Sequence, residues 1–283
     1  MHKPPPFSRR SLTIAAAFAG MVSLAIGAHA ALNLRALDAA KAATAAQENV
    51  TVKSAARLAL VIGNGHYPDA NAPLNQPIND ARALTATLRR DGFEVDVVED
   101  ASKDDMNRAV ERLKSRIRPD STVLLFFGGY GIQVGRESYM IPVDATIWKE
   151  SDVRRNGLSI ESVLEAMQAQ GAHAKLAVID ASRRNPYERR FRAYSHGLAP
   201  ISAPENALVL TSATPGRVAD DSNGQYSVLV SELLNNLDAQ AGVETSFNKT
   251  RVAVARGSDG EQVPVVSSSL IEELRLSTQN AGS

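Results

Sequence analysis

Residues 58–65 read LALVIGNG, a run of five apolar residues that Gly63-Asn64-Gly65 brings to an end. An apolar run of this length, with no polar residue in alternation, is typical of a β-strand that is buried on both faces. Such strands belong to parallel sheets with helices packed on each side. The run therefore indicates an α/β protein.

A similar pattern recurs along the chain. Short apolar runs alternate with segments whose apolar residues have helical spacing. We expect strands at 58–62, 93–98, 122–127, 176–179 and 207–210, and helices at 79–90, 103–116, 159–170 and 227–237. Strand–helix–strand units are joined by right-handed crossovers, so these strands run parallel. The expected fold is a three-layer αβα sandwich with a mostly parallel central sheet.

The composition limits what this chain can do. Its 283 residues allow one large domain or two small ones, and 44% hydrophobic with 22% charged residues is typical of a globular protein. The chain has no cysteine, which excludes disulfides, iron–sulfur clusters, thiolate zinc sites and a cysteine nucleophile. A formal net charge of zero argues against wholesale nucleic-acid binding.

The first 30 residues have the pattern of an export signal. Lys3, Arg9 and Arg10 make a positive start, residues 12–26 carry no charge, and Ala28-His29-Ala30 is a small-x-small cleavage site. The alternative is an uncleaved membrane anchor. Cleavage predicts an exported, periplasmic protein that keeps no stable membrane span.

Two consequences follow from that cleavage. Removing residues 1–30 leaves 28 basic and 31 acidic residues, a net charge of −3. The segment 8–12 also resembles a twin-arginine signal, so the general secretion and twin-arginine routes both stay open. The expected organisation is a signal at 1–30, an Ala-rich helix and linker at 31–56, a folded domain at 57–276 and a tail at 277–283.

Three loops follow the carboxyl ends of expected strands. They read GNGHYPDANAPLNQPIND (63–80), GGYGIQ (128–133) and DASRRNPY (180–187). Sites in parallel α/β sheets form at this edge, and glycines let backbone N–H groups approach a ligand. For any single glycine, the simpler explanation is that it permits a tight turn of the chain.

An ordered set of segments resembles the caspase and metacaspase family of cysteine peptidases, especially its bacterial caspase-like members. The segments are VIGN (61–64), NQPINDA (75–81), FFGGYGIQ (126–133), SYMIPVDA (138–145), VIDASRRNPY (178–187), GRVADDSNGQYSVLVSELL (216–234) and QVPVVSSSL (262–270). The resemblance covers about residues 57–276 and implies a caspase-like fold.

The departures from the family pattern fall on its catalytic pair. Tyr130 stands where the family has its histidine, and Ser182 stands where it has its cysteine. A phenol with a pKa of about 10 is a poor general base at neutral pH, and serine needs a base to become a nucleophile. We therefore expect an inactive pair, in which Tyr130 and Ser182 share a neutral hydrogen bond. An alternative is a residual serine hydrolase that uses His66 as a surrogate base.

The resemblance implies two further sets of site residues. The family's oxyanion hole maps to the backbone N–H groups of Gly131 and Ser182, and backbone donors do not need the original side chains. The acids that hold a basic substrate side chain in metacaspases map to Asp80 and Asp180. The alternatives are that Asp80 caps the following helix and that Asp180 orders its loop.

The expected function is that of an exported pseudopeptidase that binds a peptide or a partner protein in the old substrate cleft. A pure scaffold or assembly role is the other alternative. No cofactor, metal or nucleic acid is expected, although some metacaspases need calcium. The candidate calcium ligands are Asp144, Asp152, Asp220 and Asp221. Their spacing lacks the pattern of an EF-hand. The oligomeric state stays open, as does cleavage of the basic loop at 183–204.

Overall fold

The computed structural model describes residues 55–68, 73–190, 196–219, 224–237 and 241–276. The expected signal, most of the Ala-rich segment and the expected tail lie outside these residues, so their assignments stay predictions. None of the helices in the described ranges combines the length and hydropathy needed to span a bilayer.

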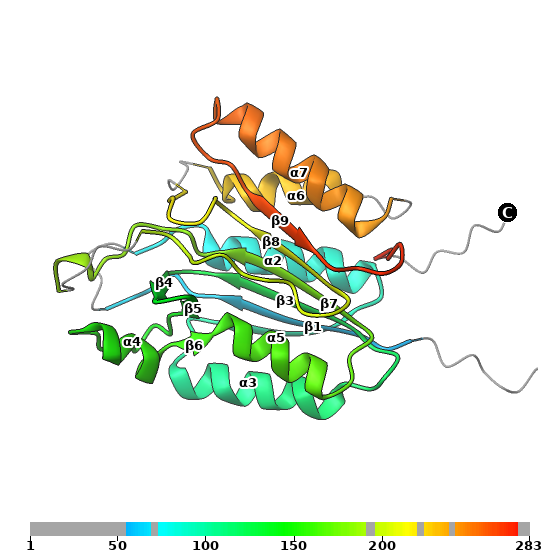
Figure 1. Cartoon of the computed structure of the whole chain (residues 1–283), viewed down its shortest axis with the longest axis horizontal. Helices are drawn as coiled ribbons and strands as arrows, with labels where there is room; N and C mark the ends of the chain where they lie inside the picture. Colours follow the sequence, from blue (N-terminus) through cyan, green and yellow to red (C-terminus); the bar gives the residue numbers. More distant parts are fainter. Residues whose placement is uncertain (1–54, 69–72, 191–195, 220–223, 238–240, 277–283) are drawn as a thin grey trace, which may run out of the picture. The chain divides into compact units, whose positions relative to one another are not determined.

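A six-stranded sheet runs through the middle of the domain (Figure 1). Its order is β2 (Glu94–Glu99), β1 (Arg57–Gly63), β3 (Thr122–Gly128), β7 (Ala174–Asp180), β8 (Ala207–Thr211) and β9 (Val265–Ser268). The first five strands are parallel and β9 runs antiparallel to β8. The predicted mostly parallel sheet is confirmed, and β9 is a strand that the sequence patterns did not indicate.

Helices cover both faces of this sheet (Figure 1). One face carries α2 (Pro77–Arg90), α6 (Val228–Asn236) and α7 (Val243–Gly257), and the other carries α3 (Lys103–Arg116) and α5 (Ile160–Ala169). Alternate residues of the buried strands divide between the two cores. Ala59 and Val61 of β1 pack toward α2, whereas Leu60 and Ile62 pack toward α3. The caspase-like three-layer sandwich is therefore confirmed.

Serine side chains fix where several helices begin. The hydroxyl of Ser102 accepts the N–H of Asp105, and Ser159 and Ser227 cap α5 and α6 in the same way. An N-cap of this kind satisfies a backbone donor that the first helical turn leaves unpaired. The helix expected at 159–170 begins at the Ser159 cap.

A second, smaller sheet was not predicted from the sequence. It consists of β4 (Gly131–Val134), β5 (Glu137–Met140) and β6 (Leu158–Ser159), all antiparallel. The short helix α4 (Glu150–Asn156) and the 3₁₀ turn η1 (Glu188–Arg190) belong to the same end of the domain (Figure 1). Strands of two to four residues are too short for a hydrophobic period to indicate them.

The strand register brings the three notable loops together. Gly63 at the end of β1 pairs with Gly128 at the end of β3, and Gly128 pairs with Asp180 at the end of β7. The loops that follow these residues therefore begin at one edge of the sheet, as predicted.

Candidate functional site

Ser182 lies just past the end of β7 and is almost completely enclosed, with 1% of its surface exposed. Its backbone N–H donates to the hydroxyl of Ser212 at 3.3 Å, and its carbonyl accepts the N–H of Ala219 at 2.6 Å. The Ser182 hydroxyl oxygen is buried and has no hydrogen-bond partner among the described residues. No described group is therefore placed to take its proton.

Tyr130 lies at the end of β3 and packs into an aromatic cluster. Its ring meets the ring of Tyr67 edge to face, with centroids 4.8 Å apart. The Tyr67 hydroxyl accepts the backbone N–H of Tyr130 at 3.0 Å and donates to the carbonyl of Ile141 at 3.0 Å. The expected hydrogen bond between Tyr130 and Ser182 is wrong, because Tyr130 packs among apolar side chains and the Ser182 hydroxyl has no partner in the described structure.

The two backbone amides of the expected oxyanion hole both have acceptors within the chain. The N–H of Gly131 donates to the carbonyl of Ala181 at 3.0 Å, and that of Ser182 donates to Ser212. A Cβ atom placed on Gly131 would lie 2.6 Å from a methyl group of Leu198, so the space beside this glycine is filled. In this conformation neither amide is available to a reacting oxygen. Sequence reasoning missed Ser212 and Leu198, which are distant in the chain.

Asp80 and Asp180 come together at this edge, and both are buried. Asp80 lies in the first turn of α2, and its carboxylate accepts the N–H of Ser227 at 3.0 Å. The alternative that Asp80 caps its own helix is wrong, because the N-cap of α2 is Gln76 and Asp80 bonds to the N-cap residue of α6. Burial, and then the neighbouring carboxylate of Asp180, raises the pKa of Asp80 to about 7.

The guanidinium of Arg183 lies beside this acidic pair. It is 3.7 Å from the carboxylate of Asp180, and both side chains are buried. It also donates to the carbonyl of Gly129 at 3.0 Å and to that of Asp180. Arg183 therefore joins the ends of β3 and β7 and supplies a positive charge that lowers the pKa of Asp80 against the larger effect of burial. The Oδ2 atoms of Asp80 and Asp180 are buried and have no hydrogen-bond partner among the described residues.

The sequence was compared with those of known protein families, and the result agrees with this arrangement of strands and loops. The sequence profile of the Caspase domain (Peptidase_C14) matches residues 56–275, which is most of the chain. The chain belongs to the caspase family. It is 30% identical over 133 residues to mucosa-associated lymphoid tissue lymphoma translocation protein 1 of Homo sapiens and to its homolog in Mus musculus. The matched segment is 47% of this chain and 16% of each relative, so the chain spans about a sixth of the curated proteins it matches.

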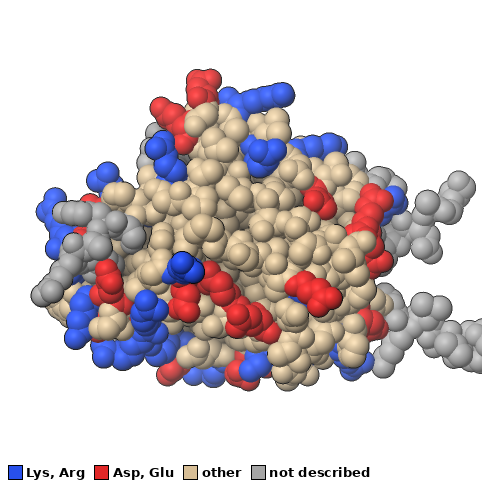
Figure 2. All heavy atoms as spheres, viewed as in Figure 1, with Lys and Arg blue, Asp and Glu red and all other residues tan. Residues whose placement is uncertain are grey.

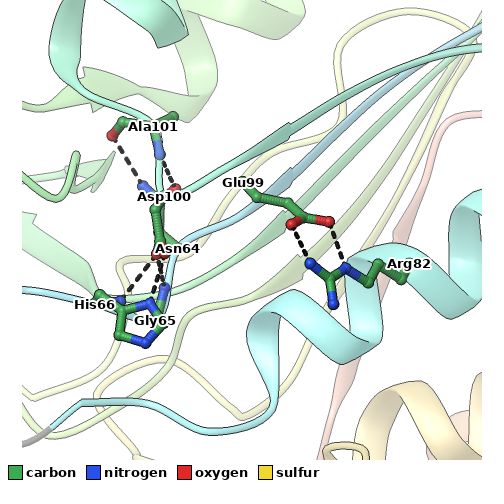
Figure 3. Close-up of polar contacts among 7 residues, drawn as sticks. All are labelled: Asn64, Gly65, His66, Arg82, Glu99, Asp100 and Ala101. Atoms are coloured by element: carbon green, nitrogen blue, oxygen red, sulfur yellow. Dashed lines mark hydrogen bonds and ion pairs between the residues drawn. The ribbon is translucent and has the colours of Figure 1, made fainter.

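His66 follows β1 and pairs with Asp100, the residue after β2 (Figure 3). Its Nδ1 lies 2.6 Å from a carboxylate oxygen of Asp100, and 72% of its side chain is exposed. Asp100 follows β2, at the far side of β1 from β3 and β7. Adjacent strands are about 4.8 Å apart, so Ser182 follows a strand about 10 Å from β1. The structure does not bring His66 to the buried Ser182 hydroxyl.

Asn64 and Asp100 organise this edge of the caspase domain, and sequence reasoning assigned them no role. The buried side chain of Asn64 accepts the N–H of Ala101 at 2.8 Å and donates to the carbonyl of Ile141 at 3.2 Å. Asp100 accepts the N–H groups of Gly65 and His66, each at 2.9 Å (Figure 3). Burial would raise the pKa of Asp100, but these bonds and the His66 ring outweigh it and lower that pKa. The N-G pair after β1 was the only sequence signal.

The acids considered for calcium are used locally where the structure describes them. Asp144 accepts the N–H of Lys103 at 2.8 Å, and Asp152 accepts the N–H of Trp148 and pairs with Arg155 at 2.6 Å. Asp220 and Asp221 lie outside the described residues. Within the described ranges, no three His, Asp or Glu side chains converge to hold a metal ion.

Proposed function

We propose that this caspase domain is a pseudopeptidase whose function is binding. The isolation of the Ser182 hydroxyl carries the proposal. A serine nucleophile needs a base to take its proton, whereas the buried Ser182 hydroxyl has no hydrogen-bond partner among the described residues. The chain has no cysteine that could replace it. The two oxyanion amides, which have internal acceptors, support the same conclusion.

The proposed ligand is a peptide or a protein segment with a basic side chain, held by Asp80 and Asp180. Two buried carboxylates favour a guanidinium through charge-assisted hydrogen bonds. Arg183 supports this chemistry, because the chain already places its own guanidinium beside the pair. A ligand's basic side chain would replace Arg183 and donate hydrogen bonds to the Oδ2 atoms, which accept none from the described residues.

Calorimetry with two peptides that differ in one side chain tests this proposal. We expect a peptide that ends in arginine to bind at least about ten-fold more tightly than the same peptide ending in leucine. Asp80→Asn should abolish the preference, and Asp120→Asn should not, because Asp120 is exposed before β3 at the opposite end of the strands. Equal affinity for the two peptides, or no binding of either, would favour the scaffold alternative.

The hydrolase alternative has its own test. A fluorophosphonate probe labels serine nucleophiles that a base activates. We expect no labelling above that of a Ser182→Ala variant, because the buried Ser182 hydroxyl has no hydrogen-bond partner among the described residues that could take its proton. Labelling that disappears in both Ser182→Ala and His66→Ala would establish the hydrolase and refute the pseudopeptidase.

Export to the periplasm belongs to the proposal, supported by the pattern of residues 1–30. Terminal sequencing of the protein from the periplasm of an expressing bacterium should begin at Ala31. A protein that stays in the cytoplasm with an intact N-terminus would contradict export while leaving the binding proposal in place.

A further inference from the structure

The only tryptophan of the chain stands exposed at the end of the domain that carries α4 and η1. Trp148 follows the buried Ile147 and precedes α4, and 64% of its surface is exposed. Its backbone N–H donates to the buried carboxylate of Asp152 at 3.1 Å, which fixes the chain at this point. The indole ring is therefore presented to the surroundings from a well-anchored backbone.

One face of the indole is covered by an arginine. The guanidinium carbon of Arg190 lies 4.4 Å from the Trp148 ring centroid and 5.3 Å from that of Tyr187. Arg190 also donates to the carbonyl of Ile147 at 2.7 Å. A cation over an aromatic face is attractive, so this contact holds the ring in one orientation while its remaining surface stays free.

Basic residues are frequent on the segments next to this tryptophan, which are α4, η1 and the turn between β4 and β5. We call the group the Trp148 surface, and it consists of Trp148, Arg136, Lys149, Arg154, Arg155, Arg189 and Arg190. Figure 2 shows Lys and Arg side chains gathered at this end of the viewed face, over α4 and η1. The neighbouring acids are Glu137, Glu150, Asp152 and Glu188, of which Glu137 and Asp152 pair with Arg154 and Arg155. Six basic against four acidic residues leave the surface positive in a chain of zero net charge.

We infer that the Trp148 surface binds a bilayer that carries anionic lipids. Basic residues near a membrane surface are attracted to anionic headgroups, and tryptophan favours the interface between headgroups and acyl chains. Trp148 does not line the three cavities of about 800, 310 and 380 Å³ described by the structure. An exposed ring among charges suits a fluid, anionic surface. The inference is independent of the proposed cleft.

Trp148 itself is the probe for the test, because all tryptophan fluorescence of the full chain comes from this one residue. The full-length protein is titrated with vesicles of equal parts phosphatidylglycerol and phosphatidylcholine, and with vesicles of phosphatidylcholine alone. We expect the emission to shift to shorter wavelength, and to be quenched by brominated acyl chains, only with the anionic vesicles. Residues 1–30 combine Lys3, Arg9 and Arg10 with an apolar stretch and can themselves bind anionic vesicles, but they contain no tryptophan, so quenching by brominated acyl chains reports on Trp148 alone.

A charge-neutralised variant tests whether this surface carries the attraction. Arg136→Gln, Lys149→Gln and Arg189→Gln together leave Trp148 in place, and each charge removed should weaken binding roughly five-fold. The matched control is Lys249→Gln, Arg251→Gln and Arg256→Gln on α7, which covers one face of the central sheet away from this end (Figure 1). It should bind like the wild type.

Three results would overturn the inference. One is an emission shift that is the same with both vesicle types. Another is equal weakening in the two triple variants. The third is a shift produced by soluble polyglutamate but not by anionic vesicles, which would assign the surface to an acidic protein partner instead.

Discussion

Asp80→Asn is expected to stabilise the protein at pH 8 and to leave it no more stable than the wild type at pH 4. Burial and the nearby Asp180 raise the pKa of Asp80 to about 7, whereas an unfolded aspartate has a pKa of about 3.9. A difference of about three units corresponds to about 4 kcal/mol of unfolding free energy. That is a large part of the total stability of a typical domain.

The sign follows from where the proton is held. Between about pH 4 and pH 7 the folded state keeps a proton on Asp80 that the unfolded chain has lost. The stability from this group is therefore complete below about pH 4 and lost as the pH rises through about 7. Asparagine stays neutral at every pH and keeps the oxygen that accepts the N–H of Ser227. Its new N–H₂ group, if unpaired, costs about 1–2 kcal/mol, so the net gain at pH 8 is about 2–3 kcal/mol.

Urea unfolding from pH 4 to pH 8 measures this effect. A gain of that size moves the midpoint by about 1 M, and the pH dependence of stability should be flatter in Asp80→Asn than in the wild type. Asp120→Asn, at an exposed aspartate, is the control and should follow the wild type. A variant that is less stable than the wild type at pH 8, or whose stability falls with pH just as steeply, would refute the assignment of a buried, charge-coupled Asp80.

Three other variants test the contacts that close the site. Tyr67→Phe should cost about 1–3 kcal/mol in urea unfolding, because the hydroxyl joins the buried backbone of Tyr130 and Ile141; a loss below about 0.5 kcal/mol would contradict this role. Gly131→Ala should lower the midpoint by a similar free energy, since its Cβ has no room, and an unchanged midpoint would show that the neighbours give way. Tyr130→His with Ser182→Cys should give no detectable cleavage of an arginine-ended fluorogenic peptide, because both oxyanion amides are engaged, whereas turnover would show an intact cleft.

The sheet and its helices could be predicted because their signals are local. The run at 58–62 and the helical spacing at 103–116 each lie within one element, and the structure places β1 and α3 at Arg57–Gly63 and Lys103–Arg116. The edge that gathers the loops could also be predicted, because parallel strands end on the same side. The small sheet β4-β5-β6 could not, since its strands are too short to show a period.

The contacts within the site join residues that are far apart in the sequence. The spacing of residues along the chain cannot predict such contacts. Asp80 bonds to Ser227, which lies 147 residues later, and Tyr130 bonds to Tyr67, which lies 63 residues earlier. Both the expected cap at Asp80 and the expected bond from Tyr130 to Ser182 were local or motif-based interpretations. They failed because tertiary packing decides both positions: Asp80 bonds to the start of α6, and the Tyr130 ring packs against Tyr67 while the Ser182 hydroxyl is left without a hydrogen-bond partner among the described residues.

The buried polar atoms at this edge that lack hydrogen-bond partners are more informative about function than the atoms that are hydrogen-bonded. Ser182 Oγ and the Oδ2 atoms of Asp80 and Asp180 are buried without hydrogen-bond partners among the described residues. Each such atom typically costs about 1–3 kcal/mol, and apolar or smaller side chains there would avoid that cost. A bound guanidinium would satisfy the two carboxylate oxygens at once. The hydroxyl of Ser182 would gain nothing from it, because without a base it remains a small polar side chain in the place of a nucleophile.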